Sequence, residues 1–149
     1  MRSHSMNVKV QDLMTNNIIT AQVHQTVGQI KDKMTKRNLS SVPVVSADKV
    51  PIGVVSASDL LAAEKEGTPI SNIMTEKVYT IPEYEDVSVA ARMMRNHKIH
   101  HLIVTQEQKL VGVLSSFDLL KLVEGHRFVM KNAPTPKNKG GGKRTKAEL

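Results

Sequence analysis

Apolar positions along the chain follow two spacings, one helical and one typical of strands. Val27, Ile30 and Met34 are three and four residues apart, which predicts a helix with one buried face. Thr26 and Gln29 form a capping-box pair at its start. In chain order the pattern predicts an extended stretch, this helix, two strands joined by a polar turn, and a second helix. These elements fall at residues 18–20, at Val27 onward, at 42–45 and 52–55, and from near Ser58.

The same string of elements is written again about 60 residues later. Aligning Val10–Val45 with Ile70–Thr105, and the nine residues from Gly53 with the nine from Gly112, gives twelve identities in 45 columns. Chance would give about three. The second copy has its helix on Val87, Ala90, Ala91 and Met94 after an Asp86 N-cap, strands at 101–104 and 110–114, and its last helix from near Phe117.

The repeat predicts an α/β (α+β) fold of two β-α-β-β-α units. A unit of roughly 60 residues buries too little surface to be stable alone, so we expect the two units to pack about a pseudo-twofold axis. Such packing creates equivalent clefts where the units meet, and ligands favour these interfaces. The predicted boundaries are 1–7 for an N-terminal extension, 8–66 and 67–124 for the units, and 125–149 for a tail. The first five residues fit either a cloning remnant ahead of a start at Met6 or native sequence.

The formal net charge of +7 is concentrated in the tail. Residues 1–125 hold 14 Lys and Arg against 13 Asp and Glu, whereas residues 126–149 hold seven against one. The tail also contains Pro134, Pro136 and three consecutive glycines, with few apolar residues, which predicts disorder. The folded part is therefore nearly neutral.

Several classes of protein are excluded by what the sequence lacks. There is no cysteine, so disulfides and thiolate chemistry are absent. No apolar run is long enough to span a bilayer, and the first residues lack the apolar centre of a signal peptide, so we expect a cytoplasmic protein without a membrane contact. No Gly-x-Ser-x-Gly, Walker or His-Glu-x-x-His motif occurs. We expect no catalytic residues and no cofactor.

The strongest local motif is Gly-Val-[Val/Leu]-Ser-x-x-Asp-Leu-Leu, which occurs once in each copy. It places a strand end, a hydroxyl and a carboxylate at a helix start. Such a group can bind phosphate through the Ser and free N–H groups, and a ribose diol through the Asp. The alternative is a structural cap in which Ser and Asp satisfy backbone N–H groups.

The doubled unit, with its Met-Thr openings, Val42-Pro43-Val44 and the two Gly-x-x-Ser-x-x-Asp runs, resembles a pair of CBS (cystathionine β-synthase) domains, together called a Bateman module. The resemblance covers residues 8–124. It implies a regulatory module that senses AMP, ADP, ATP or S-adenosylmethionine. It assigns Ser56 and Ser115 to ligand phosphate, Asp59 and Asp118 to the ribose, Thr20 and Thr80 to the base or ribose, and Val42, Pro43, Leu102 and Ile103 to the sides of the adenine.

Basic residues before the central strand of the second copy are further candidates. The resemblance implies that Lys98, His100 and His101 reach ligand phosphate. The alternatives are surface histidines with no ligand, or a metal site with His97, for which a nearby carboxylate is lacking. Since a charged donor to phosphate is worth about twice a neutral one, the second copy should prefer phosphorylated ligands. The first copy offers Asn38, Ser40 and Ser41 at these positions.

The partners expected are an adenine nucleotide, a second copy of the chain and a regulated protein. Met14, Met34 and Met74 are expected to fill the core, and a homodimer to bury helical surface around Ala90, Met93 and Met94. The competing hypothesis is a nucleic-acid-binding protein that acts through its basic tail, with the folded part as its dimerisation unit.

Overall fold

The computed structural model describes residues 7–125, so the predicted extension (apart from Asn7) and the predicted tail (apart from Gly125) lie outside the described residues. The first unit contains α1 (Val10–Leu13), β1 (Ala21–Gln22), α2 (Val27–Arg37), β2 (Ser41–Val45), β3 (Pro51–Ser56) and α3 (Ala57–Ala62). The second contains the 3-10 helix η1 (Ile70–Asn72), β4 (Thr80–Pro82), α4 (Val87–His97), β5 (His101–Gln106), β6 (Lys109–Ser115) and α5 (Ser116–Glu124).

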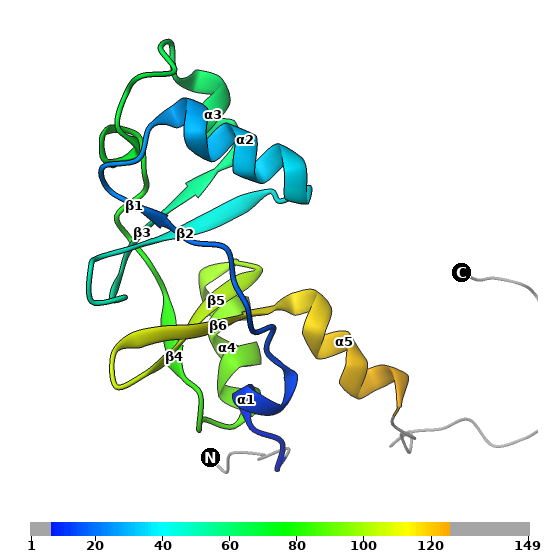
Figure 1. The fold of residues 1–149 in the computed structure, drawn as a ribbon. Coiled ribbons are helices and arrows are strands. Elements are labelled where there is room, and N and C mark those ends of the chain that lie inside the picture. The colour runs from blue at the N-terminus through cyan, green and yellow to red at the C-terminus, as the bar shows by residue number, and fades with distance from the viewer. Residues whose placement is uncertain (1–6, 126–149) are drawn as a thin grey trace, which may run out of the picture.

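The predicted order β-α-β-β-α is confirmed in both copies, with a short helical turn before each. The strands form two three-stranded sheets, β1-β2-β3 and β4-β5-β6, in which the first pair is parallel and the second antiparallel. The two sheets face each other, with α2 and α3 outside one and α1 and α4 outside the other (Figure 1). This is a mixed α+β fold in which two sheets face each other and helices cover their outer sides.

The predicted caps are present. Thr26 Oγ1 accepts from the Gln29 N–H at 3.3 Å, and Gln29 Oε1 accepts from the Thr26 N–H at 3.0 Å. Asp86 accepts from the Ser88 N–H at 2.9 Å at the start of α4. The first extended stretch, expected at residues 18–20, begins at Ala21, where the backbone first pairs with β2. In the second copy β4 begins at Thr80, opposite Ile103 of β5.

Each unit's core is completed by a segment from the other copy of the repeat. Val10 of α1 is fully buried among residues of the second unit, including Ile81 and Leu114. Ile70 of η1 is fully buried in the first unit's cluster with Ile30. The segments that open the two copies, residues 8–14 and 68–74, are therefore exchanged, because each packs in the core of the other unit. The alignment of the repeats does not reveal this exchange.

The exchange depends on two glycines. Thr15 exchanges backbone hydrogen bonds of 2.9 and 3.1 Å with Val113 of β6, and Thr75 exchanges two of 2.9 Å with Val54 of β3. A Cβ at Gly112 would meet Met14 Sδ at 2.7 Å and the Thr15 carbonyl oxygen at 2.8 Å, and one at Gly53 would meet Met74 Sδ at 2.7 Å. The close crossing of two backbones thus explains the glycine in each copy of the motif.

The expected dimer surface on α4 needs correction. Ala90 and Met94 are 0% and 5% exposed and lie in the second unit's own cluster, and Met93 packs against that cluster. Their side chains point inward because they share the helical face of Val87. Met34 is also buried in the core, and Met14 and Met74 pack at the core margins. Among the residues described, no helix is long and apolar enough to cross a membrane.

Candidate functional site

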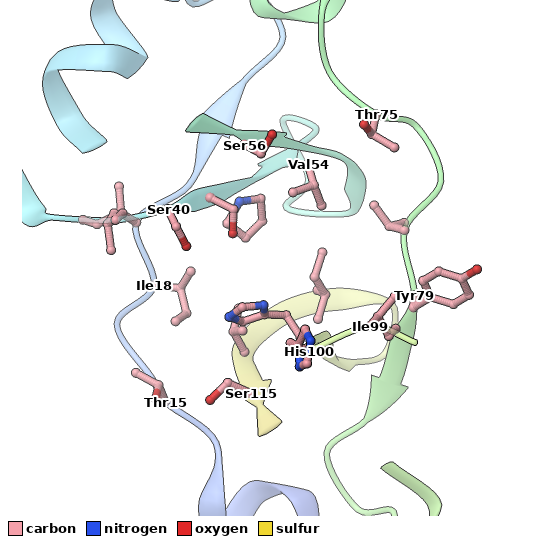
Figure 2. Close-up of a pocket in the computed structure, with 18 of the residues that line it drawn as sticks. Thr15, Ile18, Ser40, Val54, Ser56, Thr75, Tyr79, Ile99, His100 and Ser115 are labelled. Atoms are coloured by element: carbon pink, nitrogen blue, oxygen red, sulfur yellow. The ribbon is translucent and has the colours of Figure 1, made fainter. Parts of the chain in front are cut away.

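A cavity of about 920 Å³ lies between the two sheets. Figure 2 shows Val54 and Ser56 on one wall and His100 and Ser115 on the opposite wall. The two segments that carry the exchanged openings, residues 15–19 and 75–79, border the cavity on its two sides. The cavity is therefore built jointly by both units.

Ser56 and Asp59 form a capping box at the start of α3. The Ser56 N–H donates to Asp59 Oδ2 at 2.9 Å, and the Asp59 N–H donates to Ser56 Oγ at 3.2 Å. Ser56 Oγ also lies 3.0 Å from Ser58 Oγ. Both residues line the cavity, so the structural role of the motif and its exposure to a ligand coexist.

Ser115 and Asp118 repeat this geometry at the start of α5, with bonds of 2.9 and 3.1 Å. Asp118 differs from Asp59 in its surroundings. It is only 7% exposed, and Lys121 Nζ lies 3.6 Å from its Oδ1. A buried carboxylate needs a compensating donor or charge, which Lys121 supplies here.

Eight of the residues assigned from the sequence line the cavity. They come from both units and include both Ser–Asp pairs: Pro43, Ser56, Asp59, His100, His101, Ile103, Ser115 and Asp118. Asn38, Ser40 and Ser41, named as the first copy's polar candidates, line it too. The structure thus brings the two motifs to one shared space.

Two assigned residues lie elsewhere because strand residues alternate in direction. Val42 and Leu102 are fully buried in the two cores, so their side chains point away from the cavity that Pro43 and Ile103 line. The assignment of their side chains to the adenine is therefore corrected.

Three further assigned residues are not among those lining the cavity. Thr20 is half-buried, and its carbonyl oxygen accepts from Lys33 Nζ at 3.1 Å. Thr80 is exposed on β4, opposite Ile103 of β5. Lys98 is the exposed C-cap of α4, with a left-handed backbone at φ 55°. Its role is to end the helix.

The histidines of the second unit lie differently from one another. His100 Nδ1 is 3.2 Å from Ser116 Oγ, and both His100 and His101 line the cavity. His97 instead stacks on Tyr79, with ring centroids 4.4 Å apart. Within residues 7–125, no three His, Asp or Glu side chains come together as a metal site.

Sequence reasoning missed two cations that line the cavity, Arg37 and Lys77. Arg37 belongs to the last turn of α2, and Lys77 Nζ lies 5.5 Å from the centre of the Tyr79 ring. The repeat could have indicated Lys77, because Lys77 and Asn17 are equivalent positions. Each lies two residues after the Met-Thr pair that opens its copy. Asn17, Thr15 and Thr75 line the cavity as well.

A family model for the CBS domain matches residues 10–66 and again residues 70–125. The chain belongs to the CBS domain family. Its two copies form a CBS domain pair, and the mixed fold with two small sheets agrees with solved structures of such pairs. The predicted membership and fold class are thereby confirmed.

Solved structures of similar chains share this architecture. A Vibrio cholerae protein named for acetoin utilization, AcuB, is 31% identical, with a TM-score of 0.71 over 80% of this chain and 98% of its own. The CBS domain pair of protein MJ0100, solved with 5-methylthioadenosine and S-adenosyl-L-methionine, is 26% identical, with a TM-score of 0.69 over 79% of this chain and 97% of its own.

Among curated relatives, the inosine-5'-monophosphate dehydrogenase of Halobacterium salinarum is 33% identical over 70% of this chain. This match covers only 22% of the dehydrogenase. The chain spans less than half the length of each of the first three curated relatives it matches. The likeness therefore concerns only part of each relative, and the activity of the whole enzyme is not carried over.

Proposed function

We propose that this CBS pair is a regulatory module that binds an adenosine-containing ligand in the cavity between its sheets. The observation that carries the proposal is that both Ser–Asp capping boxes open onto this one cavity. The AMP, ADP, ATP and S-adenosylmethionine class is the one that the family resemblance implied. We infer that the module transmits occupancy of the cavity to a regulated protein by contact, the regulatory role that the family resemblance implies.

The cavity offers chemistry suited to each part of such a ligand. Asp59 and Asp118 each have one carboxylate oxygen held by a Ser N–H, which fixes the carboxylate toward the cavity for a ribose diol. Pro43 and Ile103 supply apolar surface for a base. Arg37 and Lys77 supply positive charge for phosphate, and the two histidines supply ring nitrogens for hydrogen bonds to it.

The ligands of MJ0100 support the adenosine part of the proposal. Both 5-methylthioadenosine and S-adenosyl-L-methionine carry an adenosine, and that chain is 26% identical to this one over nearly its whole length. Neither carries a phosphate. The phosphate preference of this chain therefore rests on its own cations.

A thermal-shift panel tests the proposal. AMP, ATP, S-adenosylmethionine, NAD and a plain polyanion are each added to the full chain. At 100 times the Kd a ligand stabilises the folded state by about 2.7 kcal/mol, which raises the melting temperature measurably. A response to adenosine compounds supports the proposal. A response to the polyanion alone would favour the nucleic-acid alternative, and no response would leave a structural module with an empty cavity.

Calorimetry with Asp118→Ala and Asp59→Ala locates the ligand. We expect Asp118→Ala to weaken AMP binding by about 2 kcal/mol, as for hydrogen bonds to a charged acceptor, and Asp59→Ala to weaken it less. The reason is that the second unit presents His100 and His101 to phosphate. Because each Asp also caps a helix, the melting temperature of both variants is measured alongside. Equal losses of affinity would show that the Asp118 half of the cavity does not bind AMP more strongly than the Asp59 half.

The homodimer is proposed on a surface other than the buried face of α4. Phe117, Leu120 and Val123 lie three residues apart on α5 and are 75%, 55% and 55% exposed. An exposed apolar row of this kind marks an interaction site, and a twofold contact pairs the row with itself. Sedimentation of Leu120→Glu should show a monomer where the parent chain is a dimer. A variant that still dimerises would exclude this row.

A further inference from the structure

Among the differences between the two halves of the cavity, one places a charge beside the repeated motif of one copy only. Lys121 follows Asp118 by three residues, and Ala62 follows Asp59 by three. Resting on the proposed function, we propose that Lys121 is a specificity-determining residue. It makes the Asp118 half accept a phosphorylated ligand, while the Asp59 half, which lacks such a partner, favours an uncharged or cationic adenosine ligand.

The first line of evidence is the pairing at Asp118. This carboxylate is almost fully buried, Ser115 N–H donates to its Oδ2 at 2.9 Å, and Lys121 Nζ lies 3.6 Å from its Oδ1. Lys121 is not among the residues that line the cavity, so its ammonium acts on the Asp from the outer side. The pair presents a carboxylate to the cavity with no net charge.

The second line of evidence is the contrast at Asp59. Its Oδ2 accepts from the Ser56 N–H at 2.9 Å, and no ion pair with it is found within residues 7–125. Ala62, the last residue of α3, is exposed and carries no charge. Asp59 therefore stands at the wall of the cavity without an ion-pair partner among the described residues.

The consequence for a ligand follows from Coulomb's law. A phosphate near Asp59 meets a carboxylate that has no ion-pair partner among the described residues, whereas near Asp118 part of the same repulsion is offset by Lys121. A neutral nucleoside experiences neither effect, and a sulfonium ligand gains from Asp59. Because Lys121 is itself more than half exposed, solvent screens the interaction and the discrimination is modest.

The test exchanges the two positions and compares AMP with adenosine, which differ only in the phosphate. The readout is the ratio of the adenosine Kd to the AMP Kd, measured by calorimetry on the full chain. We expect the ratio to fall about two- to fivefold in Lys121→Gln and to rise by a similar factor in Ala62→Lys. Both changes should shrink in about 1 M salt, where the Debye length is about 3 Å.

Two controls separate charge from structure. Lys109→Gln removes an exposed lysine that does not line the cavity and should leave the ratio unchanged. Melting temperatures of all variants report on the fold. If AMP and adenosine bind but the ratio stays constant, or both affinities change equally, the inference is overturned and the proposed function stands. If neither ligand binds the parent chain, both are overturned.

Discussion

At the scale of single residues, Gly53 and Gly112 allow two chain segments to cross in contact. Gly112 is the tighter position, because a Cβ there would meet a backbone oxygen at 2.8 Å as well as the Met14 sulfur. The sulfur can move with its flexible side chain, but the Thr15 carbonyl oxygen is held by the hydrogen bond that it accepts from the Val113 N–H. The cost of a methyl group at this position therefore falls on the backbone.

We predict that Gly112→Ala destabilises the chain by about 1–3 kcal/mol, as overpacking of a tight contact does. Urea unfolding measures the change. Gly67→Ala is the matched control, because a Cβ at Gly67 would meet no atom within 4 Å. We expect this control to change stability by less than about 0.5 kcal/mol. Equal stabilities of the two variants would contradict the crossing contact.

Residues on which the two copies agree were predicted to share one site, and the cavity brings together some of them but not Thr20 and Thr80. Ser56, Asp59, Ser115 and Asp118 were found because the same motif stands at the same place in each repeat, and all four line the cavity. Arg37 was missed because its equivalent, His97, stacks on Tyr79 instead of lining the cavity. Comparing the copies finds residues that both share, and it does not find a cavity residue such as Arg37 that only one copy has.

At the scale of elements, the exchanged openings hold the two units together. Ile70 is completely buried in the first unit, and the Ile70 N–H donates to the Gln25 carbonyl at 2.8 Å. Val10 is equally buried in the second unit, and its N–H donates to the Glu85 carbonyl at 2.8 Å. Neither unit has a complete core without the other's segment.

We predict that Ile70→Ala costs about 2–5 kcal/mol, as the loss of a buried large side chain does. Because the segments are exchanged, both units should still unfold in one transition, seen by calorimetry and by near-ultraviolet signals of Tyr79 and Tyr84. Val23→Ala serves as the control, because Val23 is 37% exposed and belongs to neither core cluster. Two separated transitions would mean that the units are stable independently.

The elements themselves were predictable, because helical and strand spacings extend over enough residues to be distinctive. The destination of residues 8–14 and 68–74 was not. These segments are short, and their few apolar side chains fit a core without a periodicity that says which core. Their partners are set by tertiary packing alone.

At the scale of the whole molecule, the cavity belongs to neither copy alone. Its walls are two sheets from different units, and its sides are residues 15–19 and 75–79, which follow the two exchanged segments in the chain (Figure 2). Ala90 and Met94 also show that the sequence of one element does not reveal what packs against it. An apolar helix face suggested a contact with another chain, whereas this chain's own sheet covers it.

We predict that removing residues 126–149 leaves adenine-nucleotide binding unchanged. The cavity lies wholly within residues 15–118, and the deleted part carries most of the net positive charge. Thermal shifts with AMP and with a plain polyanion, compared with those of the full chain, measure this. Only the polyanion response should fall, with a salt dependence expected of phosphate contacts. A lost AMP response would require the tail in the site.

The exchange of opening segments has a consequence for how such a molecule could arise and be divided. A half-chain ending near residue 66 carries Val10 without the core that receives it, and lacks the Ile70 that fills its own. Two identical half-chains could each place their first segment in the core of the other and form the cavity between them with true twofold symmetry. In the present chain both copies belong to one polypeptide, so the two halves of the cavity can differ, as they do at positions 62 and 121.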